Sequence, residues 1–507
     1  MAEPGTVYLV GAGPGDAGLL TCRGAELLQK ATLVVYDALV NPGLLALAPA
    51  DAEILYAGKR ASAHAIPQED LNQLLVEKAG EGGAIVRLKG GDPLVFGRGG
   101  EEAAELKAAG IPFEIVPGIS SAMAAPAYAG IPVTHRDHCS SFTVITGHEQ
   151  PGKDESSIDW EKLAKETGTR IILMGVDRIR AIAGRLQENG LPGETPVAMV
   201  RWGTTGRQET LVGTLADIAE KVEQAAFKAP AVTIIGGVVN LREQLNWFEN
   251  RQLFGRRIVV TRTRQQASQL SRRLAGLGAD ILEIPTIRIV PPAEKQPLMD
   301  AILGIASYDW LVFTSPNGVD QFFHWFLQTF DDIRSIGGCQ IAAVGPATAA
   351  KLKQLHLRVD LMPEKYTAKA VAQAFKDHQN IENLTLCLLR AEVANPDLPK
   401  VLHEMGGIVD DIPIYRTVPE SEDRNGAATR LAEEGADIIT FTSSSTVENF
   451  HARFDLPRMM KKHNLQSVSI GPETTKALVK LGQPPAVEAS PHNIEGMIEA
   501  VLSVSRK

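Results

Sequence analysis

The second half of the sequence contains a duplication, and this feature constrains the fold more than any other. Four motifs recur in the same order, and their two copies are separated by 128, 128, 128 and 126 residues. The pairs are Arg262 and Arg390, 283–288 (EIPTIR) and 411–416 (DIPIYR), 313–319 (FTSPNGV) and 441–447 (FTSSSTV), and 344–348 (VGPAT) and 470–474 (IGPET). Four matches in order predict two similar lobes, and a cleft between similar lobes is a usual place for a ligand.

The first 240 residues alternate short β-rich runs with helical patterns, which is typical of an α/β fold. Helices are expected at Leu19–Lys30 and Glu101–Ala109, and an amphipathic segment at 241–249 closes this half. Strands are expected at Thr6–Val10, Thr32–Tyr36, Ala84–Leu88, Phe113–Val116, Ser141–Thr146, Arg170–Met174, Pro196–Val200 and Ala231–Ile235. A basic start at 255–262 (GRRIVVTR) opens another α/β unit, so we divide the chain into domains 1–250 and 251–507.

Length, charge and cysteine spacing limit the classes of function. A chain of 507 residues holds about three or four folding units of ordinary size. The net charge of −9 argues against broad nucleic-acid binding, and no apolar run approaches the roughly 18 residues of a membrane helix. The four cysteines lack metal-type spacing, and the N-terminus lacks a secretory pattern. We expect a cytoplasmic protein with reduced thiols that binds neither nucleic acid nor membrane.

The most distinctive segment of the first half is the glycine-rich run Arg87–Glu102. It contains five glycines, one proline, three cations and three carboxylates, directly after the apolar run Ala84–Val86. Such a loop buries little apolar surface, so packing does not explain it. Its glycines let the backbone approach a ligand closely, and its mixed charges suit a charged ligand. The run therefore predicts a ligand site rather than an ordinary turn.

A dinucleotide-dependent oxidoreductase is one alternative for this half. Residues 13–18 (GPGDAG) fit the G-x-G-x-x-G pattern, and Asp37 follows the next strand, as in a nicotinamide or flavin site. Two features argue against it. Pro14 lacks the backbone donor that a pyrophosphate needs, and Asp16 places a negative charge where the phosphates would lie.

The pair His135 and His138 suggests metal binding only weakly. A three-residue spacing without further ligands is insufficient for a metal site, since structural and catalytic zinc sites use three or four protein ligands. We interpret these histidines as structural or substrate-facing and expect no metal.

Further motifs in the first half accompany the glycine-rich run. They are 35–40 (VYDALV), 58–60 (GKR), 116–122 (VPGISSA), 130–136 (GIPVTHR), 172–175 (ILMG) and 201–206 (RWGTTG). With these motifs, residues 5 to about 250 resemble the uroporphyrinogen-III C-methyltransferases of the tetrapyrrole methylase family. The resemblance implies two α/β lobes with S-adenosylmethionine (SAM) between them, leaving as S-adenosylhomocysteine. It places Pro14, Gly90, Gly91, Asp92, Val95, Ser120, Ser121, Met174 and Gly203 in the SAM pocket.

The resemblance also implies a reaction. Two methyl groups would be transferred to C2 and C7 of uroporphyrinogen III, giving precorrin-2. Asp37 would be the proton acceptor and Lys59 the proton donor, although Asp37 could instead cap a helix and Lys59 could be a solvated cation. Arg98 and Arg136 are expected to bind substrate carboxylates.

Residues 255–507, through the duplicated motifs, resemble uroporphyrinogen-III synthase. The resemblance implies one lobe at about 291–417 and another built from 256–290 and 418–507. It also implies closure of hydroxymethylbilane to uroporphyrinogen III, with ring D inverted and no cofactor. Tyr415, whose counterpart in the other repeat is Ile287, would assist the departure of hydroxide. A structural role for this tyrosine is the alternative.

Hydroxyl and amide side chains at strand-to-helix turns are expected to bind the substrate's carboxylates, or else to be helix N-caps. These are Thr314, Ser315, Asn317, Ser443, Ser444, Thr474 and Thr475. Arg262 and Arg390 either pair with those carboxylates or with neighbouring acids. Together the halves predict a bifunctional enzyme of sirohaem or cobalamin synthesis, dimeric through its first half as the resemblance implies. A tetrapyrrole-binding scaffold with one active half is the rival.

Overall fold

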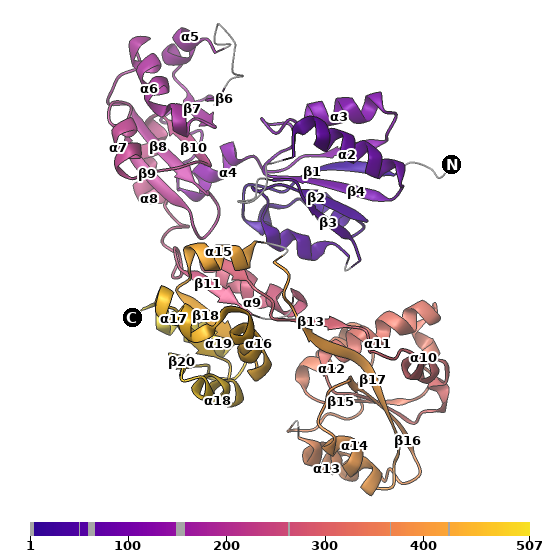
Figure 1. Cartoon of the computed structure of the whole chain (residues 1–507). Coiled ribbons are helices and arrows are strands. Elements are labelled where there is room, and N and C mark those ends of the chain that lie inside the picture. Colours follow the sequence, from indigo (N-terminus) through magenta and orange to yellow (C-terminus); the bar gives the residue numbers. More distant parts are fainter. Residues whose placement is uncertain are drawn as a thin grey trace. The chain divides into compact units, whose positions relative to one another are not determined.

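The computed structural model describes residues 5–49, 51–58, 66–148, 158–261, 264–365, 367–423 and 426–506. The chain forms two compact units, one made of residues 1–284 with 422–507 and the other of residues 285–421 (Figure 1). The second unit agrees within a few residues with the lobe expected at 291–417. The chain therefore leaves the first unit, builds a complete second unit, and returns.

The first unit begins with a parallel sheet of order β3-β2-β4-β1-β5. Its strands are β1 (Thr6–Gly11), β2 (Leu33–Tyr36), β3 (Glu53–Tyr56), β4 (Ala84–Lys89) and β5 (Phe113–Val116). Helices α2 (Gln68–Gly80) and α3 (Gly99–Ala108) pack side by side on one face (Figure 1), and α1 (Cys22–Leu28) packs on the other. Because the strands are parallel, their carboxyl ends and the following loops share one edge.

A second, mixed sheet follows, of order β6-β7-β10-β8-β9. Its strands are β6 (Phe142–Thr146), β7 (Thr169–Leu173), β8 (Pro196–Arg201), β9 (Glu209–Thr214) and β10 (Ala231–Ile235). The helices around it are α4 (Ser121–Tyr128), α5 (Trp160–Lys165), α6 (Ile179–Glu188), α7 (Ile218–Gln224) and α8 (Arg242–Leu245). Since β10 is antiparallel to both β7 and β8, those two strands run in the same direction and end at the same edge.

The duplication is visible in the two remaining sheets. The first unit contains β12-β11-β18-β19-β20 and the second β13-β17-β16-β14-β15, so β12-β11-β18-β19 corresponds to β17-β16-β14-β15. All pairs within these two sets are parallel. The strands are β11 (Arg257–Val260), β12 (Asp280–Glu283), β13 (Ile287–Val290), β14 (Trp310–Phe313), β15 (Gln340–Ala343), β16 (Thr385–Ala391), β17 (Ile408–Pro419), β18 (Ile438–Phe441), β19 (Gln466–Ser469) and β20 (Val487–Glu488). The repeated sequence motifs thus encode a repeated topology.

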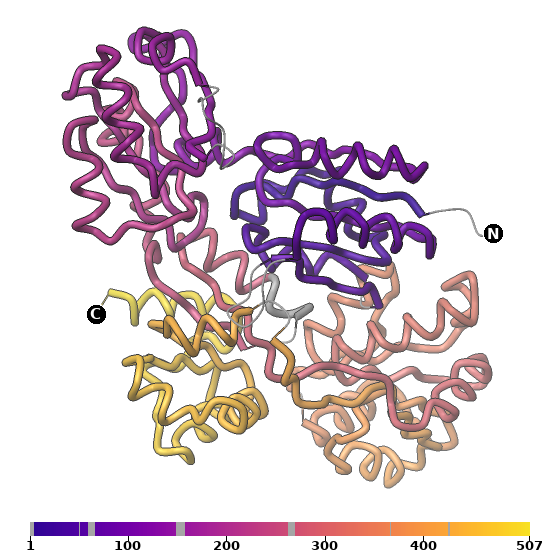
Figure 2. The backbone as a smooth tube through the Cα atoms, turned by 45° about the horizontal axis from the view of Figure 1, so that its top comes forward, coloured from indigo at the N-terminus to yellow at the C-terminus, as the bar shows by residue number. Residues whose placement is uncertain are grey.

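The helices of the duplicated half follow the strands in alternation. Those of the second unit are α10 (Gln296–Leu303), α11 (Pro316–Thr329), α12 (Pro346–Gln354), α13 (Ala368–His378) and α14 (Asp397–Glu404). Those of the first unit are α9 (Arg264–Gly276), α15 (Ala427–Glu434), α16 (Ser444–Phe454), α17 (Leu456–His463), α18 (Pro472–Lys480) and α19 (Ile494–Ser505). The entering and leaving segments of the second unit lie side by side, because β13 pairs antiparallel with β17 from Ile287↔Pro419 to Val290↔Arg416 (Figure 2).

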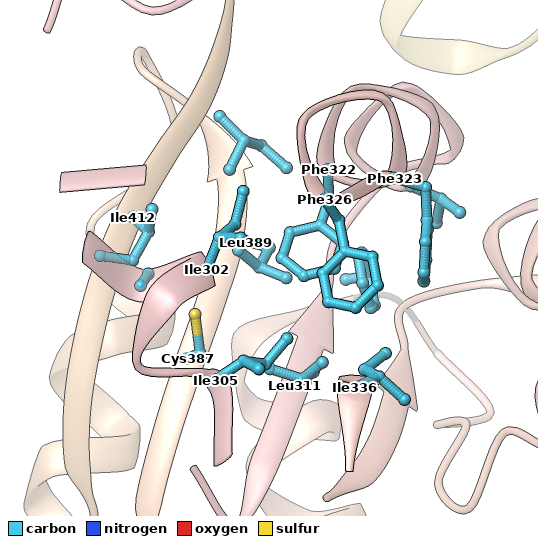
Figure 3. Packing of buried hydrophobic residues seen from close by; sticks show 14 of the residues in the cluster. Ile302, Ile305, Leu311, Phe322, Phe323, Phe326, Ile336, Cys387, Leu389 and Ile412 are labelled. Atoms are coloured by element: carbon cyan, nitrogen blue, oxygen red, sulfur yellow. The ribbon is translucent and has the colours of Figure 1, made fainter. Parts of the chain in front are cut away.

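The largest aromatic core lies beneath α11 in the second unit. Phe322, Phe323 and Phe326 recur at the spacing of one helix face and are at most 4% exposed. Figure 3 shows them packed near Leu311 of β14 and Leu389 of β16. This packing holds the first turn of α11 against the carboxyl ends of the central strands.

The expected strands of the first half are confirmed, whereas two edge strands, β3 and β9, were not predicted. The amphipathic segment at 241–249 is helical only as far as Leu245, because Asn246 is extended (ψ 90°) and Trp247 Nε1 donates to the Ala127 carbonyl at 3.0 Å. In the ranges that the structure describes, no helix is long and apolar enough to span a membrane.

Candidate functional site

Glycines interlock the loops that follow β1, β4 and β5. A Cβ on Gly118 would lie 2.2 Å from the Gly91 carbonyl oxygen and 2.7 Å from Gly11 Cα, so no side chain fits there. Gly13 and Gly91 exchange backbone hydrogen bonds, with N···O distances of 3.2 and 2.7 Å. The three loops therefore meet through their backbones, which leaves peptide groups rather than side chains facing a ligand.

Asp92 fixes the shape of the loop after β4. Its Oδ1 accepts from the amides of Leu94 (2.8 Å) and Val95 (3.2 Å), and its Oδ2 accepts from the Gly118 amide (3.0 Å). The carboxylate thus organises its own loop and ties it to the loop after β5.

Most residues predicted to bind SAM lie in these loops, at the carboxyl edge of the first sheet. They are Pro14, Gly90, Gly91, Asp92, Val95, Ser120 and Ser121. Met174 and Gly203 directly follow β7 and β8, at one edge of the second sheet, and Met174 is 53% exposed. A Cβ on Gly15 would lie 2.5 Å from Thr205 Cγ2. The loop after β1, residues 13–18 and called the glycine loop below, therefore contacts the loop that contains Gly203. The structure therefore places the loop after β8, in the second lobe, against the loop after β1, in the first.

The backbone at Gly91 fits a ligand that is held by peptide groups. Gly91 has φ 71°, a conformation that favours glycine, and its Cβ position would lie 3.8 Å from Ser121 N and 3.9 Å from Ser120 Cα. That position is the space between two loops, beside the first turn of α4. An aminoacyl group suits such a cradle.

Asp16 has a structural explanation. Its carboxylate accepts from the Gly18 amide (2.8 Å) and from the Tyr128 hydroxyl (2.8 Å). A fixed negative charge in the glycine loop disfavours a pyrophosphate at this position.

Asp37 follows β2 and faces a cation. Its Oδ1 accepts from the Leu39 amide at 3.0 Å, and its Oδ2 lies 3.6 Å from Arg87 Nη2. The carboxylate therefore caps a turn, rather than the helix that the structural alternative expected, and also pairs with a buried guanidinium.

Beneath Asp37 lies a buried charge cluster of Arg87, Lys89 and Glu102, with exposed fractions of 4%, 4% and 1%. Lys89 Nζ donates to Glu102 Oε1 at 2.7 Å, and Arg87 Nε lies 3.4 Å from the same oxygen. Burial, and then the charge of Arg87, lower the pKa of Lys89. Glu102 Oε2 is buried and has no hydrogen-bond partner among the described residues. The cluster holds a cation rigidly under Asp37.

The other charged residues predicted for the first half differ in their surroundings. Lys59 lies outside the described residues. Arg98 is paired with Glu101 (Nη2–Oε2 2.6 Å) and is about half exposed, whereas Arg136 is exposed. A substrate carboxylate would have to compete with Glu101 for Arg98.

His135 and His138 lie together, with ring centroids 5.2 Å apart. Within the described ranges, no three His, Cys, Asp or Glu side chains gather as a metal site, and all four cysteines are free thiols.

In the second unit, Tyr415 and Ser315 meet. Their hydroxyl oxygens are 3.0 Å apart, and Tyr415 on β17 is 6% exposed. Ser315 also accepts from the Gly318 amide at 3.0 Å as the N-cap of α11, and the Thr314 amide donates to the Leu389 carbonyl at 3.4 Å. Asn317 is partly exposed in the first turn of α11. Capping thus occupies one side of Ser315, and Tyr415 lies on another.

The corresponding hydroxyls of the other lobe already have protein partners. Ser443 caps α16 by accepting from the Thr446 amide at 3.3 Å, and Ser444 Oγ donates to the Glu473 carbonyl at 3.0 Å. Thr475 Oγ1 lies 2.7 Å from Ser469 Oγ. Thr474 is 3% exposed.

Arg390 has a neighbouring acid, one of its two expected interpretations. Its Nε donates to Asp411 Oδ1 at 2.6 Å, and its Nη1 donates to the Asn395 carbonyl at 2.6 Å. Arg262 lies outside the described residues.

Comparison with known proteins agrees with this two-part geometry. Residues 6–219 match the family model of the tetrapyrrole (corrin/porphyrin) methylases, and residues 268–499 match that of uroporphyrinogen-III synthase HemD. The porphyrin biosynthesis protein HemD of Ruminiclostridium josui is 38% identical over 99% of this chain and 98% of its own length. The chain belongs to this family of fused tetrapyrrole-synthesis proteins.

Within the family, the first half has a single-domain relative. The S-adenosyl-L-methionine-dependent uroporphyrinogen III methyltransferase of Methanosarcina barkeri (strain Fusaro) is 53% identical over 48% of this chain and 94% of its own length. Among solved structures, uroporphyrin III C-methyl transferase of Thermus thermophilus is 40% identical, with a TM-score of 0.41, covering 47% of this chain and all of that one.

Family membership replaces the hypothesis of a dinucleotide-dependent oxidoreductase. The buried charge cluster under Asp37 was not predicted from the sequence. Arg87, Lys89 and Glu102 belong to the glycine-rich run but received no individual assignment. The pattern did contain a sign of them, because Arg87 and Lys89 alternate with apolar residues on a strand whose last five positions are buried. A charge in such a strand is rarely tolerated without a partner.

Proposed function

We propose that this protein is a bifunctional enzyme of tetrapyrrole synthesis. Its duplicated half (251–507) would close hydroxymethylbilane to uroporphyrinogen III, and its first half (1–250) would methylate that product twice from SAM, at C2 and C7, to give precorrin-2. The observation that carries the proposal is the full-length relative at 38% identity, together with matches to both family models in one chain.

In the first half, the interlocked loops would hold SAM by backbone groups, between the glycine loop and Gly203. SAM supplies an electrophilic methyl group on a sulfonium, and the reaction needs that group aligned with a ring carbon. Asp37 would accept the proton that the macrocycle loses on methylation, and Arg87, whose Nη2 lies 3.6 Å from Asp37 Oδ2, would orient its carboxylate. Lys59 would donate a proton, and Arg98 and Arg136 would contact the carboxylates of the macrocycle.

In the duplicated half, Tyr415 would donate a hydrogen bond to the departing hydroxide. Its hydroxyl lies 3.0 Å from Ser315, which can accept or donate and so fix the direction of the phenol. The remaining capping residues, Thr314, Asn317, Ser443, Ser444 and Thr475, lie at strand-to-helix turns, where the partial positive charge of helix N-termini suits carboxylates.

Precorrin-2 is a precursor of both sirohaem and cobalamin, and either end product is compatible with the proposal. We also propose that the protein forms a homodimer through its first half and that it is located in the cytoplasm.

The deciding experiment is anaerobic incubation of the purified chain with hydroxymethylbilane and methyl-labelled SAM, followed by separation of tetrapyrroles by isomer and label. We expect doubly labelled type III product. Unlabelled type III product would leave only the synthase, whereas type I product alone, from spontaneous closure, would favour a binding scaffold.

A further inference from the structure

A ring of hydrogen bonds joins the two lobes of the methylase half beside the SAM loops. The Asp16 amide donates to Thr204 Oγ1 (3.0 Å), and the Thr204 amide donates to Gln208 Oε1 (2.9 Å). Gln208 Nε2 lies 3.3 Å from the Tyr128 carbonyl, to which it donates, and the Tyr128 hydroxyl donates to Asp16 Oδ2 (2.8 Å). The ring therefore connects the glycine loop, the end of α4 and the loop after β8.

The ring lies next to two residues proposed to bind SAM. Pro14 precedes Asp16 by two positions, and Gly203 precedes Thr204 directly. Thr204 and Gln208 are 2% and 4% exposed, so their hydrogen bonds are shielded from water. Loss of one bond would leave a buried polar group unsatisfied, which costs more than the bond itself contributes.

The loop after β8 depends on such contacts for its shape. Trp202 (φ 48°) and Thr204 (φ 72°) both adopt the left-handed backbone conformation that residues other than glycine disfavour. Arg207 covers the Trp202 ring, with its guanidinium carbon 3.5 Å from the ring centroid. A backbone in this conformation persists only where its surroundings hold it, and the ring supplies that constraint at Thr204.

Glu249 fixes the orientation of Gln208. Glu249 Oε1 accepts from Gln208 Nε2 (2.8 Å) and Thr210 Oγ1 (2.6 Å), and Arg242 also donates to this carboxylate. Burial alone would raise the pKa of Glu249, but these hydrogen bonds hold it below its ordinary value. An ionised carboxylate only accepts, so Gln208 must turn its NH₂ group toward Glu249 and its oxygen toward Thr204.

We propose that this ring sets the spacing of the two loops that hold SAM, with Thr204 and Gln208 as positioning residues and Glu249 as the group that orients Gln208. The inference rests on the proposed methyltransferase function. Because Glu249 precedes the synthase half by only a few residues, the junction between the two domains is part of the support of the SAM site.

The first test replaces Thr204 with valine, which keeps the shape of the side chain and removes the acceptor for the Asp16 amide. We expect the Kd and KM for SAM to rise roughly tenfold, the factor that corresponds to one buried hydrogen bond, while kcat at saturating SAM stays within about twofold. Thr204→Ser, which retains the hydroxyl, should restore binding. Isothermal titration of the full chain and initial methylation rates measure these values.

Thr143→Val is the matched control, because Thr143 Oγ1 donates to Glu166 Oε2 at 2.7 Å in the same lobe but outside the ring. An equal loss of SAM affinity in Thr143→Val, or an unchanged Kd in Thr204→Val, would overturn the positioning role. If the unaltered chain binds no SAM, the methyltransferase proposal itself fails, so the two failures are distinguishable.

The second test reverses which member of the Gln208–Glu249 pair donates the hydrogen bond. Gln208→Glu puts two carboxylates together at Glu249 and should weaken SAM binding by more than tenfold. Adding Glu249→Gln restores a donor between the two positions and should recover most of that loss. A double variant no better than Gln208→Glu alone would show that Glu249 does not act through Gln208. Synthase activity should stay unchanged in every variant.

Discussion

At the scale of single residues, Asp37 caps a turn with one carboxylate oxygen and pairs with a buried cation through the other. One oxygen accepts from the Leu39 amide, and the other faces Arg87, whose own position is held by Glu102. The sequence predicted Asp37 as a candidate but not the cation below it. That pairing depends on strands β2 and β4 being neighbours, which spacing along the chain does not reveal.

Asp37→Asn should lower methyl transfer by roughly 10²- to 10⁴-fold, because an amide cannot accept the proton that the macrocycle loses on methylation. Closure of hydroxymethylbilane by the same chain should be unaffected. Asp51→Asn, at an exposed turn of the same lobe, is the control and should behave like the unaltered protein. Coupled assays with labelled SAM measure both rates, and persistent methylation in Asp37→Asn would exclude Asp37 as the base.

Tyr415→Phe should slow ring closure by roughly 10- to 100-fold, because the phenol no longer assists hydroxide departure. Tyr308→Phe provides a matched control in the same unit, since Tyr308 also loses one hydrogen bond, 2.7 Å long, to Asp410. The ratio of type III to type I product reports the effect. Equal losses in the two variants would support a structural role for Tyr415, the alternative that its 6% exposure leaves open.

At the scale of elements, most of the predicted strands contain buried runs, although β5 and β6 were predicted without one. Edge strands β3 and β9 lack such runs, and each begins with an exposed glutamate, Glu53 or Glu209. The apolar spacing at 241–249 fits a helix, but the helix ends at Leu245. Two residues later, the Trp247 side chain donates a hydrogen bond to a backbone carbonyl of α4 instead. Periodicity therefore located the core elements, and contacts between distant segments decided the rest.

Gly118→Ala should weaken SAM binding at least tenfold, since its methyl group would lie 2.2 Å from the Gly91 carbonyl oxygen and must push two loops apart. Gly100→Ala, in α3 with nothing within 4 Å of the added methyl, should leave binding unchanged and stabilise the helix by up to about 1 kcal/mol. Titration of each variant with SAM compares them. Normal affinity in Gly118→Ala would contradict the role given to the interlocked glycines.

At the scale of the whole molecule, the resemblance to uroporphyrinogen-III synthase implied that the chain leaves one lobe and returns to it, and the duplication predicted the repeated topology of the second half. What it did not predict is where the copies differ. Strand β20, which pairs with β19 at the edge of its sheet, has no counterpart in the matched set. Repeated motifs specify a common topology, whereas the surroundings of each side chain depend on the residues that have changed between copies.

The fusion should not prevent the intermediate from mixing with the solution. A linker raises the effective concentration of tethered groups, but it does not confine a small untethered molecule, which diffuses away rapidly. With hydroxymethylbilane as substrate, added isotopically heavy uroporphyrinogen III should therefore appear in the methylated product in proportion to its share of the pool. Mass spectrometry during the first turnovers measures that share. A methylated product that stays isotopically light despite excess heavy uroporphyrinogen III would require direct transfer between the two halves.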